Sequence, residues 1–218
     1  MSKLVGAGQI LGLLSNGQTL MIGGFAAWGV PDRLIDLVIR SQVSGLTVIS
    51  NDASYTDVCV GKLVPGPQVS RIICSHVGMN PAVGRAVEDG SLEIELSPQG
   101  TLAERIRCGG AGLGGVLVST GLGTVVADGA QVVTVDGKDY LLATPLTADV
   151  ALVKAYAADP TGNLVYKGTQ RSFNPLMAMA GKTVVVEAEH LVAEGELDMD
   201  SVVTPGVFVH YVLDGGQH

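Results

Sequence analysis

The sequence predicts an α/β fold: a mixed, largely parallel sheet flanked by helices, with an added β-hairpin. In the first half of the chain, short apolar segments typical of buried strands alternate with segments of helical periodicity. Near Gln131 this alternation gives way to paired β segments around a tight turn. The 218 residues are 47% hydrophobic, enough for a sizeable core, and no linker or repeat divides them. We therefore expect residues 1–218 to form a single domain.

The first half begins with an expected short amphipathic helix over residues 4–14, which the Asn16-Gly17 turn ends. A buried strand follows at Thr19–Ile22 and leads into a glycine-rich loop. Pro31 suits the first position of the next helix, whose apolar residues recur at helical spacing as far as Ser41. The remaining elements expected here are strands at 46–50, 71–74 and 92–96 and helices at 81–87 and 101–108. Because strands and helices alternate, we expect parallel pairing.

The second half of the chain has more β character. Asp136-Gly137 stands between two apolar segments and predicts a β-hairpin with a primed turn over residues 132–142. Later strands are expected at 150–154, 164–166, 183–188 and 207–212.

The chain is acidic, with a net charge of -8 and a pI near 4.8, which argues against nucleic acid or an anionic membrane as the main partner. No apolar run reaches the roughly 18 residues of a membrane span. Cys59, Cys74 and Cys108 are odd in number and far apart, so we expect reduced, buried thiols in a cytoplasmic protein. The four histidines lack the spacing of a metal site, and we expect no metal. An anionic ligand must then be held by local groups.

The loop from Gly23 to Pro31 lies where a strand ends and a helix begins, which is where open α/β sheets bind ligands. Two adjacent glycines, Gly23 and Gly24, let a ligand approach the main chain. Val30, expected at the helix N-cap, has no side-chain oxygen, so the first amides of the helix are expected to be open to a phosphate or carbonyl oxygen. From the residues alone, a glycine pair that serves only a tight turn fits equally well.

A second glycine cluster, Gly110–Gly115, matches the G-x-G-x-x-G pattern of dinucleotide-binding folds. That fingerprint requires a strand before it and a helix after it. Here the expected helix comes before the cluster, and the apolar residues 116–118 follow it. The order argues against a nucleotide-dependent dehydrogenase.

Polar residues follow two other predicted strands. Gln99 and Gly100 lie just ahead of a helix that the capping box from Thr101 to Glu104 is expected to start, and their donors could face a substrate carbonyl. Ser50-Asn51-Asp52 occupies the equivalent point after another strand. For Asp52, ordering of its own turn and contact with a ligand are both open.

Several stretches together resemble the α subunit of family I CoA-transferases. Asn16-Gly17, Leu20-Met21-Ile22 and GGFAAWGVP from Gly23 follow the family's α-subunit signature in order and spacing. Further similar stretches are LTVISND from Leu46, SHVGMNPAVGR from Ser75, PQGTLAERIR with CGGAGLGG between Pro98 and Gly115, PLTADVALVKA from Pro145, GNLVYKGTQRSFNPLMAMA from Gly162 and VTPGVF from Val203. They span Asn16 to Phe208. Three of them, SHVGMNP, TADVALVKA and YKGTQRSFNP, are most similar to the acetate or butyrate:acetoacetate enzymes.

The resemblance implies a subunit of an enzyme that moves CoA between a short-chain acyl-CoA and a carboxylate, with acetate, butyrate and acetoacetate as the acids. It implies a β subunit as partner, in a heterodimer or heterotetramer, whose glutamate forms a glutamyl-CoA thioester. No glutamate of this chain lies in the family's nucleophile motif. We therefore expect no catalytic nucleophile in this chain and no activity without the β subunit. CoA is a substrate, and no resident cofactor is expected.

The same resemblance assigns binding residues. The CoA-binding signature consists of Gly23, Gly24, Phe25, Ala26, Ala27, Trp28 and Gly29. Asn51, Gln99 and Gly100 would line the acyl site near the reacting carbonyl. Trp28 departs from the family, in which a small or thiol-bearing side chain is usual, so the indole is expected to narrow the acyl pocket or to pack against the partner. The first of these options predicts that Trp28→Gly broadens acyl-chain tolerance.

A ligand-sensing domain of similar α/β architecture, without catalysis, is the alternative interpretation. Such domains accompany DNA-binding segments in bacterial repressors, and this acidic chain has neither such a segment nor a basic patch. A neighbouring reading frame for a β subunit would favour the transferase.

Overall fold

The computed structural model describes residues 1–63 and 67–214, and its main element is a largely parallel sheet. The strands are β1 Leu4–Val5, β2 Thr19–Ile22, β3 Leu46–Ser50, β4 Val69–Cys74, β5 Glu93–Leu96, β9 Ala148–Ala158, β10 Leu164–Val165, β11 Gly181–Leu191 and β12 Tyr211–Leu213. Within the described residues, the order is β1-β12-β11-β9-β2-β3-β4-β5. Every pair on this path is parallel, and β10 is antiparallel to β9. The predicted sheet is confirmed.

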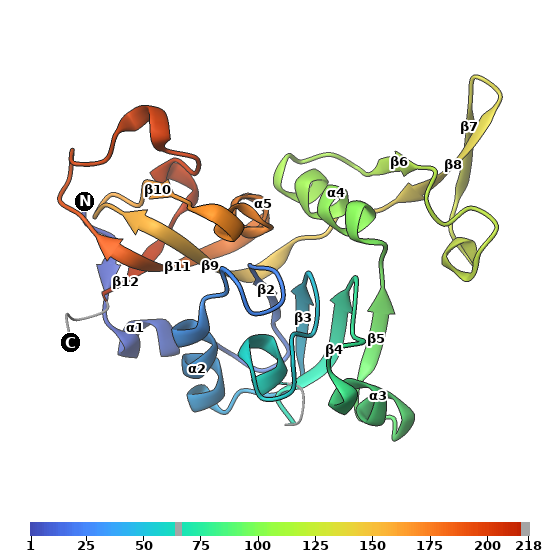
Figure 1. Ribbon diagram of the computed structural model, residues 1–218, viewed down its shortest axis with the longest axis horizontal. Helices are drawn as coiled ribbons and strands as arrows, with labels where there is room; N and C mark the ends of the chain where they lie inside the picture. Colours follow the sequence, from blue (N-terminus) through green and yellow to red (C-terminus); the bar gives the residue numbers. More distant parts are fainter. Residues whose placement is uncertain (64–66, 215–218) are drawn as a thin grey trace.

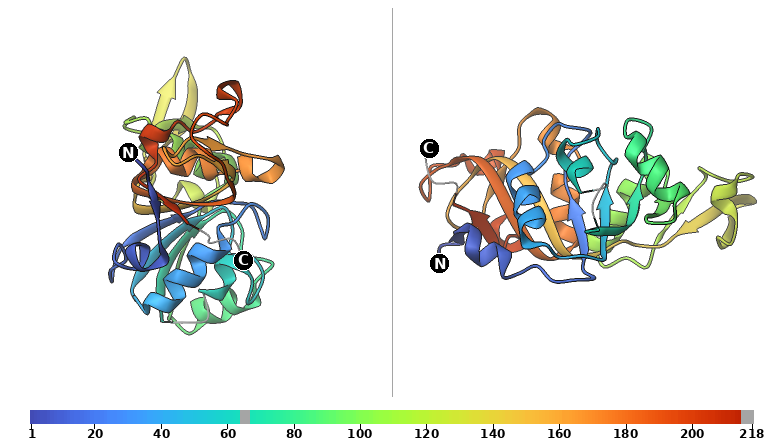
Figure 2. Two further views of the ribbon diagram at one scale, coloured as in Figure 1. Left: turned by 90° about the vertical axis from the view of Figure 1, so that its left-hand side faces the viewer. Right: turned by 90° about the horizontal axis from the view of Figure 1, so that it is seen from below.

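Helices cover both faces of this sheet, as Figures 1 and 2 show. One face carries α1 Ala7–Leu11, α2 Asp32–Ser41, the short 3-10 helix η1 Cys59–Lys62 and α3 Pro81–Glu88, and the other carries α4 Gln99–Gly110 and α5 Asn174–Ala180. In β2, Leu20 and Ile22 pack into the core beneath α2, whereas Met21 packs into the core beneath α4 and α5. Because both faces are buried, the strands are continuous apolar runs.

A smaller antiparallel sheet, which we call the arm, projects from the α4 side of the molecule (Figure 1). It consists of β6 Val116–Val118, β7 Val132–Val135 and β8 Lys138–Ala143, in the order β6-β8-β7. Asp136 and Gly137 both have positive φ, 50° and 74°, as a type I′ turn requires. The predicted hairpin is confirmed.

Two predictions near the chain ends are wrong. The segment 4–14 is not one helix, because Leu4 and Val5 pair with β12 and only α1 is helical. The strand expected at 207–212 is shorter and later, because Gly206–Phe208 forms a 3-10 helix, η5, before β12. Gly206 is fixed by a hydrogen bond from its N–H to Asn163 Oδ1, 2.9 Å long. Contacts distant in sequence decide both cases.

The expected capping box at the start of α4 is also wrong. The helix begins at Gln99, with Pro98 at the N-cap, so Thr101 already lies inside the first turn. Glu104 instead pairs with Arg107, at 2.8 Å. Among the described residues, no helix is both long and apolar enough to cross a bilayer.

Candidate functional site

The site predicted from the sequence lies at the carboxyl ends of β2 and β3. There a narrow crevice is lined by Ile22, Gly23, Gly24, Ala26, Val30, Ser50, Asn51, Asp52 and Val60. This is the edge at which parallel α/β sheets bind ligands. The structure thus brings the glycine loop and Asn51 together.

Hydrogen bonds within the glycine loop fix its shape. Phe25 and Trp28 exchange two backbone bonds, of 2.9 and 2.8 Å, which close the tip of the loop. The N–H of Ala26, whose φ is 50°, donates to Asp52 Oδ2 at 2.7 Å. A buried carboxylate thereby anchors the tip to the end of β3.

Four amides of the loop are left for other partners. Gly24, Ala27, Gly29 and Val30 make no N–H hydrogen bond among the residues that the structure describes. Gly24 and Gly29 have φ of +111° and +65°, conformations that favour glycine. Of the four residues, Gly24 and Val30 are buried, whereas Ala27 and Gly29 are half-buried.

Asn174, fully buried at the start of α5, holds the loop from the other side. Its Nδ2 donates to the carbonyl oxygen of Gly29 at 2.9 Å and to that of Gln170 at 3.0 Å, and its Oδ1 accepts from Lys154 N–H at 2.8 Å. A β-carbon at Gly23 would collide with this side chain, and one at Gly29 would lie 2.8 Å from Gln170 Cα. Close packing therefore requires glycine at both positions, and at Gly29 the positive φ of 65° favours glycine as well.

The N-terminus of α2 differs from the prediction. The N-cap residue is Pro31 and not Val30, and although Pro31 provides no side-chain cap, the first amides of the helix are not open to a ligand. Glu187 Oε2, from β11, accepts hydrogen bonds from the N–H groups of Arg33 and Leu34 at 2.8 and 3.2 Å. Glu187 is only 3% exposed, and its Oε1 lies 2.7 Å from Lys154 Nζ. The prediction of open amides is wrong, because a residue far along the chain supplies the cap.

Asp52 belongs to the scaffold of the site. Its Oδ1 accepts from Ser54 N–H at 2.7 Å and its Oδ2 accepts from Asn51 Nδ2 at 2.6 Å, in addition to the bond from Ala26. The side chain is 4% exposed. The structure therefore gives Asp52 the role of ordering its turn and the glycine loop.

Asn51 and Gln99 are brought together by a hydrogen bond of 2.7 Å from Gln99 Nε2 to Asn51 Oδ1. Asn51 is buried, and Ser75 Oγ donates to its backbone carbonyl at 2.6 Å, so its position is fixed. Gln99 is exposed, so it is the member of this hydrogen-bonded group that lies at the surface. Gln99 and Gly100 are the first residues of α4 rather than a loop ahead of it, and Gly100 has open space around its Cα.

Trp28 points outward. Its side chain is 70% exposed, and neither Trp28 nor Phe25 lines the crevice. Tyr55 and Val58, on the loop that follows β3, are also exposed. Together these side chains give the site an apolar rim.

The thiols are unsuited to nucleophilic chemistry. Burial raises the pKa of Cys59 and of Cys74 to about 11, and Asp32 adds to the effect on Cys59. Both therefore stay protonated at neutral pH. All three cysteines are buried and unpaired, as predicted. Within the described residues there is no group of three His, Cys, Asp or Glu side chains that could hold a metal.

The second glycine cluster has a packing role. The helix α4 ends at Gly110 and β6 begins at Val116, so helix precedes and strand follows, opposite to the dinucleotide arrangement. A β-carbon at Gly109 would meet the backbone of Leu146, and one at Gly110 would lie 2.7 Å from Met179 Cβ. A larger cavity, about 570 Å³, lies between the start of α4 and the arm, and none of the predicted site residues lines it.

Three residues of the site were missed by the sequence analysis: Lys154, Asn174 and Glu187. A signal for two of them exists, because a lysine within ALVKAYA and a glutamate within VVVEAEH interrupt apolar strands. Charged residues at such positions are usually paired. Their pairing with each other and with α2 depends on the sheet order and cannot be taken from the pattern.

Comparison with known proteins places this geometry in context. A family model described as coenzyme A transferase matches residues 9–215. The chain is 48% identical over 212 residues to the acetoacetyl-CoA:acetate/butyrate CoA transferase alpha subunit of Clostridium acetobutylicum, with 97% of each chain covered. It is 45% identical to the acetate CoA-transferase subunit alpha of Escherichia coli K12, covering 97% of this chain and 96% of that one.

Solved structures share the fold. An acyl-CoA transferase of Escherichia coli O157:H7, determined as a thioester complex with CoA, superposes with a TM-score of 0.87 at 21% identity, and this chain spans 50% of its length. Glutaconate coenzyme A-transferase of Acidaminococcus fermentans gives a TM-score of 0.86 at 19% identity, with 97% of this chain and 75% of that chain covered.

Proposed function

Because this chain belongs to the coenzyme A transferase family, we propose that it is the α subunit of an enzyme that moves CoA between short-chain acyl-CoA and carboxylates. The relatives' names support acetate, butyrate and acetoacetate as the acids. The partner is a β subunit of the same family, in a heterodimer or heterotetramer. CoA is a substrate in this proposal, and the enzyme needs no resident cofactor or metal.

The reaction proceeds through a glutamate of the β subunit. Its carboxylate oxygen adds to the acyl carbonyl of the thioester, and the CoA thiolate leaves. The thiolate then adds to the glutamyl carbonyl, and the first acid departs as a carboxylate, which leaves a glutamyl-CoA thioester. The acceptor acid takes the CoA by the same steps in reverse. This chain supplies no nucleophile, and its carboxylates Asp52 and Glu187 are both committed to backbone amides.

The observation that supports this proposal most strongly is that two groups of hydrogen-bond donors, the loop amides and the Gln99 side chain, lie near each other at one edge of the sheet. The glycine loop presents the amides of Gly24, Ala27 and Gly29, and beside it Asn51 holds Gln99 at 2.7 Å. Positioned donors of this kind stabilise the oxyanion that forms when a carboxylate attacks a thioester. Gln99 and the loop amides would thus orient the substrate carbonyl toward the partner's glutamate.

The test is reconstitution. Purified α and β chains, mixed, are expected to transfer CoA from acetoacetyl-CoA to acetate and to butyrate, whereas this chain alone is expected to be inactive. Activity of this chain alone would contradict the proposal. We also propose a cytoplasmic location, which the three unpaired, buried cysteines support.

A further inference from the structure

The acidity of the chain raises the question of where the phosphate groups of an acyl-CoA would bind. The first amides of α2, an ordinary anion site beside a glycine loop, are occupied by Glu187 at 2.8 and 3.2 Å. A second anion there would face a buried carboxylate. The phosphates therefore need side-chain cations.

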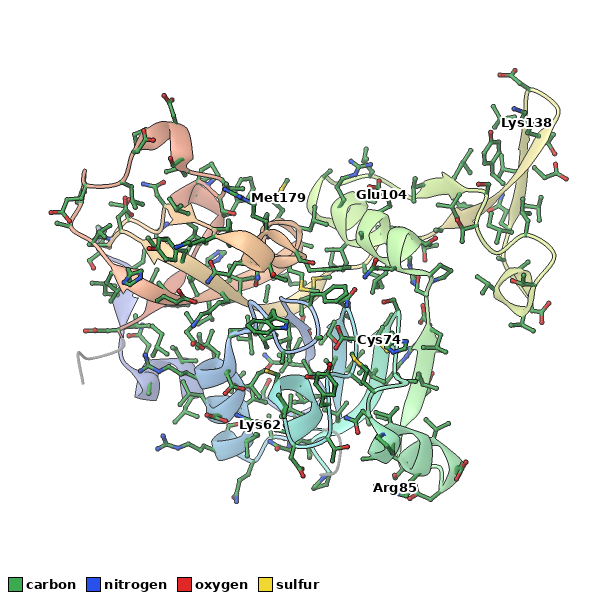
Figure 3. The ribbon with its side chains drawn as sticks, in the orientation of Figure 1. Lys62, Cys74, Arg85, Glu104, Lys138 and Met179 are labelled. Atoms are coloured by element: carbon green, nitrogen blue, oxygen red, sulfur yellow. The ribbon has the colours of Figure 1, made fainter. Side chains whose placement is uncertain are left out.

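Six of the thirteen lysines and arginines form ion pairs with carboxylates of the described residues. Lys62 lies 2.9 Å from Asp32 and from Asp36, Lys154 pairs with Glu187, and the remaining pairs involve Arg71, Arg105, Arg107 and Lys182. Arg40, in the last turn of α2, forms no ion pair within the described residues. The same is true of Arg85 on α3 and of Lys138 on the arm, which Figure 3 labels. None of these three adjoins the glycine loop.

Two exposed cations lie on a segment whose backbone packs against this loop. Lys167 is the N-cap residue of the 3-10 helix η3 Gly168–Arg171, and Arg171 is the last residue of that helix; neither has a carboxylate partner within the described residues. The backbone of Gln170 in this helix packs directly against Gly29, and Asn174 bonds to the carbonyl oxygens of both residues. The two cations are therefore carried by a segment fastened to the ligand loop.

The position of Lys167 suits a ligand that extends away from the loop. Its Nζ lies 4.8 Å from the ring centroid of Tyr156, on β9. Ile22, the last residue of β2, pairs with Leu152, so Tyr156 stands four residues further along β9, or about 13 Å at the usual rise of a strand. In CoA an extended pantetheine arm separates the thioester from the phosphates. A cation removed from the loop by this order of distance matches that shape.

We propose that Lys167 and Arg171 bind the phosphate groups of acyl-CoA while its thioester lies at the glycine loop and Gln99. This inference rests on the proposed function and adds the direction in which the substrate lies. The thioester end of acyl-CoA points toward β3 and α4, and the phosphate end lies over η3. The carboxylate of Glu189 is not paired with either cation. Its Oε1 accepts a hydrogen bond of 2.7 Å from Gln170 Nε2.

The test compares two thioesters in the assembled enzyme. Acetoacetyl-CoA carries the phosphates, and acetoacetyl-pantetheine lacks them. In the Lys167→Gln, Arg171→Gln double variant, kcat/KM for acetoacetyl-CoA is expected to fall at least tenfold, mainly through KM, while kcat/KM for acetoacetyl-pantetheine is unchanged. The matched control, Arg40→Gln with Arg85→Gln, removes the same charge from exposed sites and is expected to change neither value.

Any result other than a selective loss with acetoacetyl-CoA would contradict this inference. An equal loss with both thioesters would mean that η3 has only a structural role, and no loss with either would mean that the phosphates bind elsewhere. Both results would overturn this inference and leave the proposed function intact. A wild-type assembly that transfers neither CoA from acetoacetyl-CoA nor pantetheine from acetoacetyl-pantetheine would overturn the proposed function and this inference with it.

Discussion

The carboxylate of Glu187 accepts a 2.8 Å hydrogen bond from the backbone N–H of Arg33 and so closes the N-terminus of α2 from a strand that lies more than a hundred residues later in the chain. The same carboxylate is paired with Lys154 at 2.7 Å. Helix, strand and glycine loop are thereby fixed to one another. The consequence for function is that backbone donors of the loop, and not of the helix, are available to a ligand.

This arrangement predicts a large stability effect at Glu187. The substitution Glu187→Gln leaves the largely buried ammonium group of Lys154 without a counter-charge, and breaking a buried ion pair in this way costs about 3 kcal/mol or more of the free energy of unfolding. Urea unfolding at pH 7 measures the change. The control is Lys182→Gln, which breaks a pair with Asp149 in which the lysine side chain is 74% exposed, and a loss below about 1 kcal/mol is expected there. Equal losses would contradict the account of Glu187.

Gln99 is predicted to act in the chemical step. Removal of its amide in Gln99→Ala takes away a donor that Asn51 positions at 2.7 Å, and kcat of the assembled enzyme is expected to fall roughly tenfold to a hundredfold. Steady-state kinetics with acetoacetyl-CoA and acetate measure the effect. The control, Gln9→Ala, changes an exposed glutamine of α1 and should leave kcat as in the wild type. A wild-type kcat in Gln99→Ala would remove this residue from the site.

The structure favours one of the two roles that the sequence predicts for Trp28, which are narrowing of the acyl pocket and packing against the partner subunit. Because the indole is 70% exposed and lies outside the crevice, we predict that it packs against the β subunit. Trp28→Ala is then expected to raise the Kd of the two chains about thirtyfold, as loss of about 2 kcal/mol at an interface hot spot does. Titration of one chain with the other measures it. Unchanged assembly with a broader range of acyl chains would favour the acyl-pocket role instead.

The buried thiols predict a loss of stability in alkali. An unfolded cysteine has a pKa near 9, whereas burial raises the pKa of Cys59 and Cys74 to about 11. Between these values the unfolded chain has released protons that the folded chain retains, so the free energy of unfolding falls as the pH rises from 9 toward 11. Urea unfolding at pH 8 and pH 10 measures the fall, which should be smaller in the Cys59→Ala, Cys74→Ala variant. Tyr166, whose pKa burial raises from 10 to about 12, adds to the fall mainly above pH 10.

Local patterns predicted the parts of the fold that depend on local chemistry. Apolar runs placed β2 and β3 at their observed bounds, and Asp136-Gly137 predicted the turn of the arm. The helix α5 was missed, since it has only seven residues and follows Phe173, whose φ is 59°. Its place is set by the burial of Asn174 against the glycine loop, which no local pattern encodes.

The site shows the same division. Resemblance brought Asn51 and Gln99 to one place, and their hydrogen bond agrees with it. The prediction of an open N-terminus for α2 was wrong. The local sequence shows that Val30 has no side-chain oxygen to cap the helix, but it does not show that Glu187, far along the chain, binds the same amides. In the sheet, β11 lies two strands from β2, which leads into the loop. The order of the strands depends on the folding of the whole chain, so a local sequence pattern does not predict this contact.

The central claim is that this chain positions acyl-CoA while the partner's glutamate carries the covalent chemistry. The most direct test is the intact mass of both chains after the assembled enzyme is exposed to acetoacetyl-CoA without an acceptor acid. We predict a CoA adduct on the β subunit alone, which disappears when acetate is added. A CoA adduct on this chain, or CoA transfer by this chain without its partner, would contradict the claim.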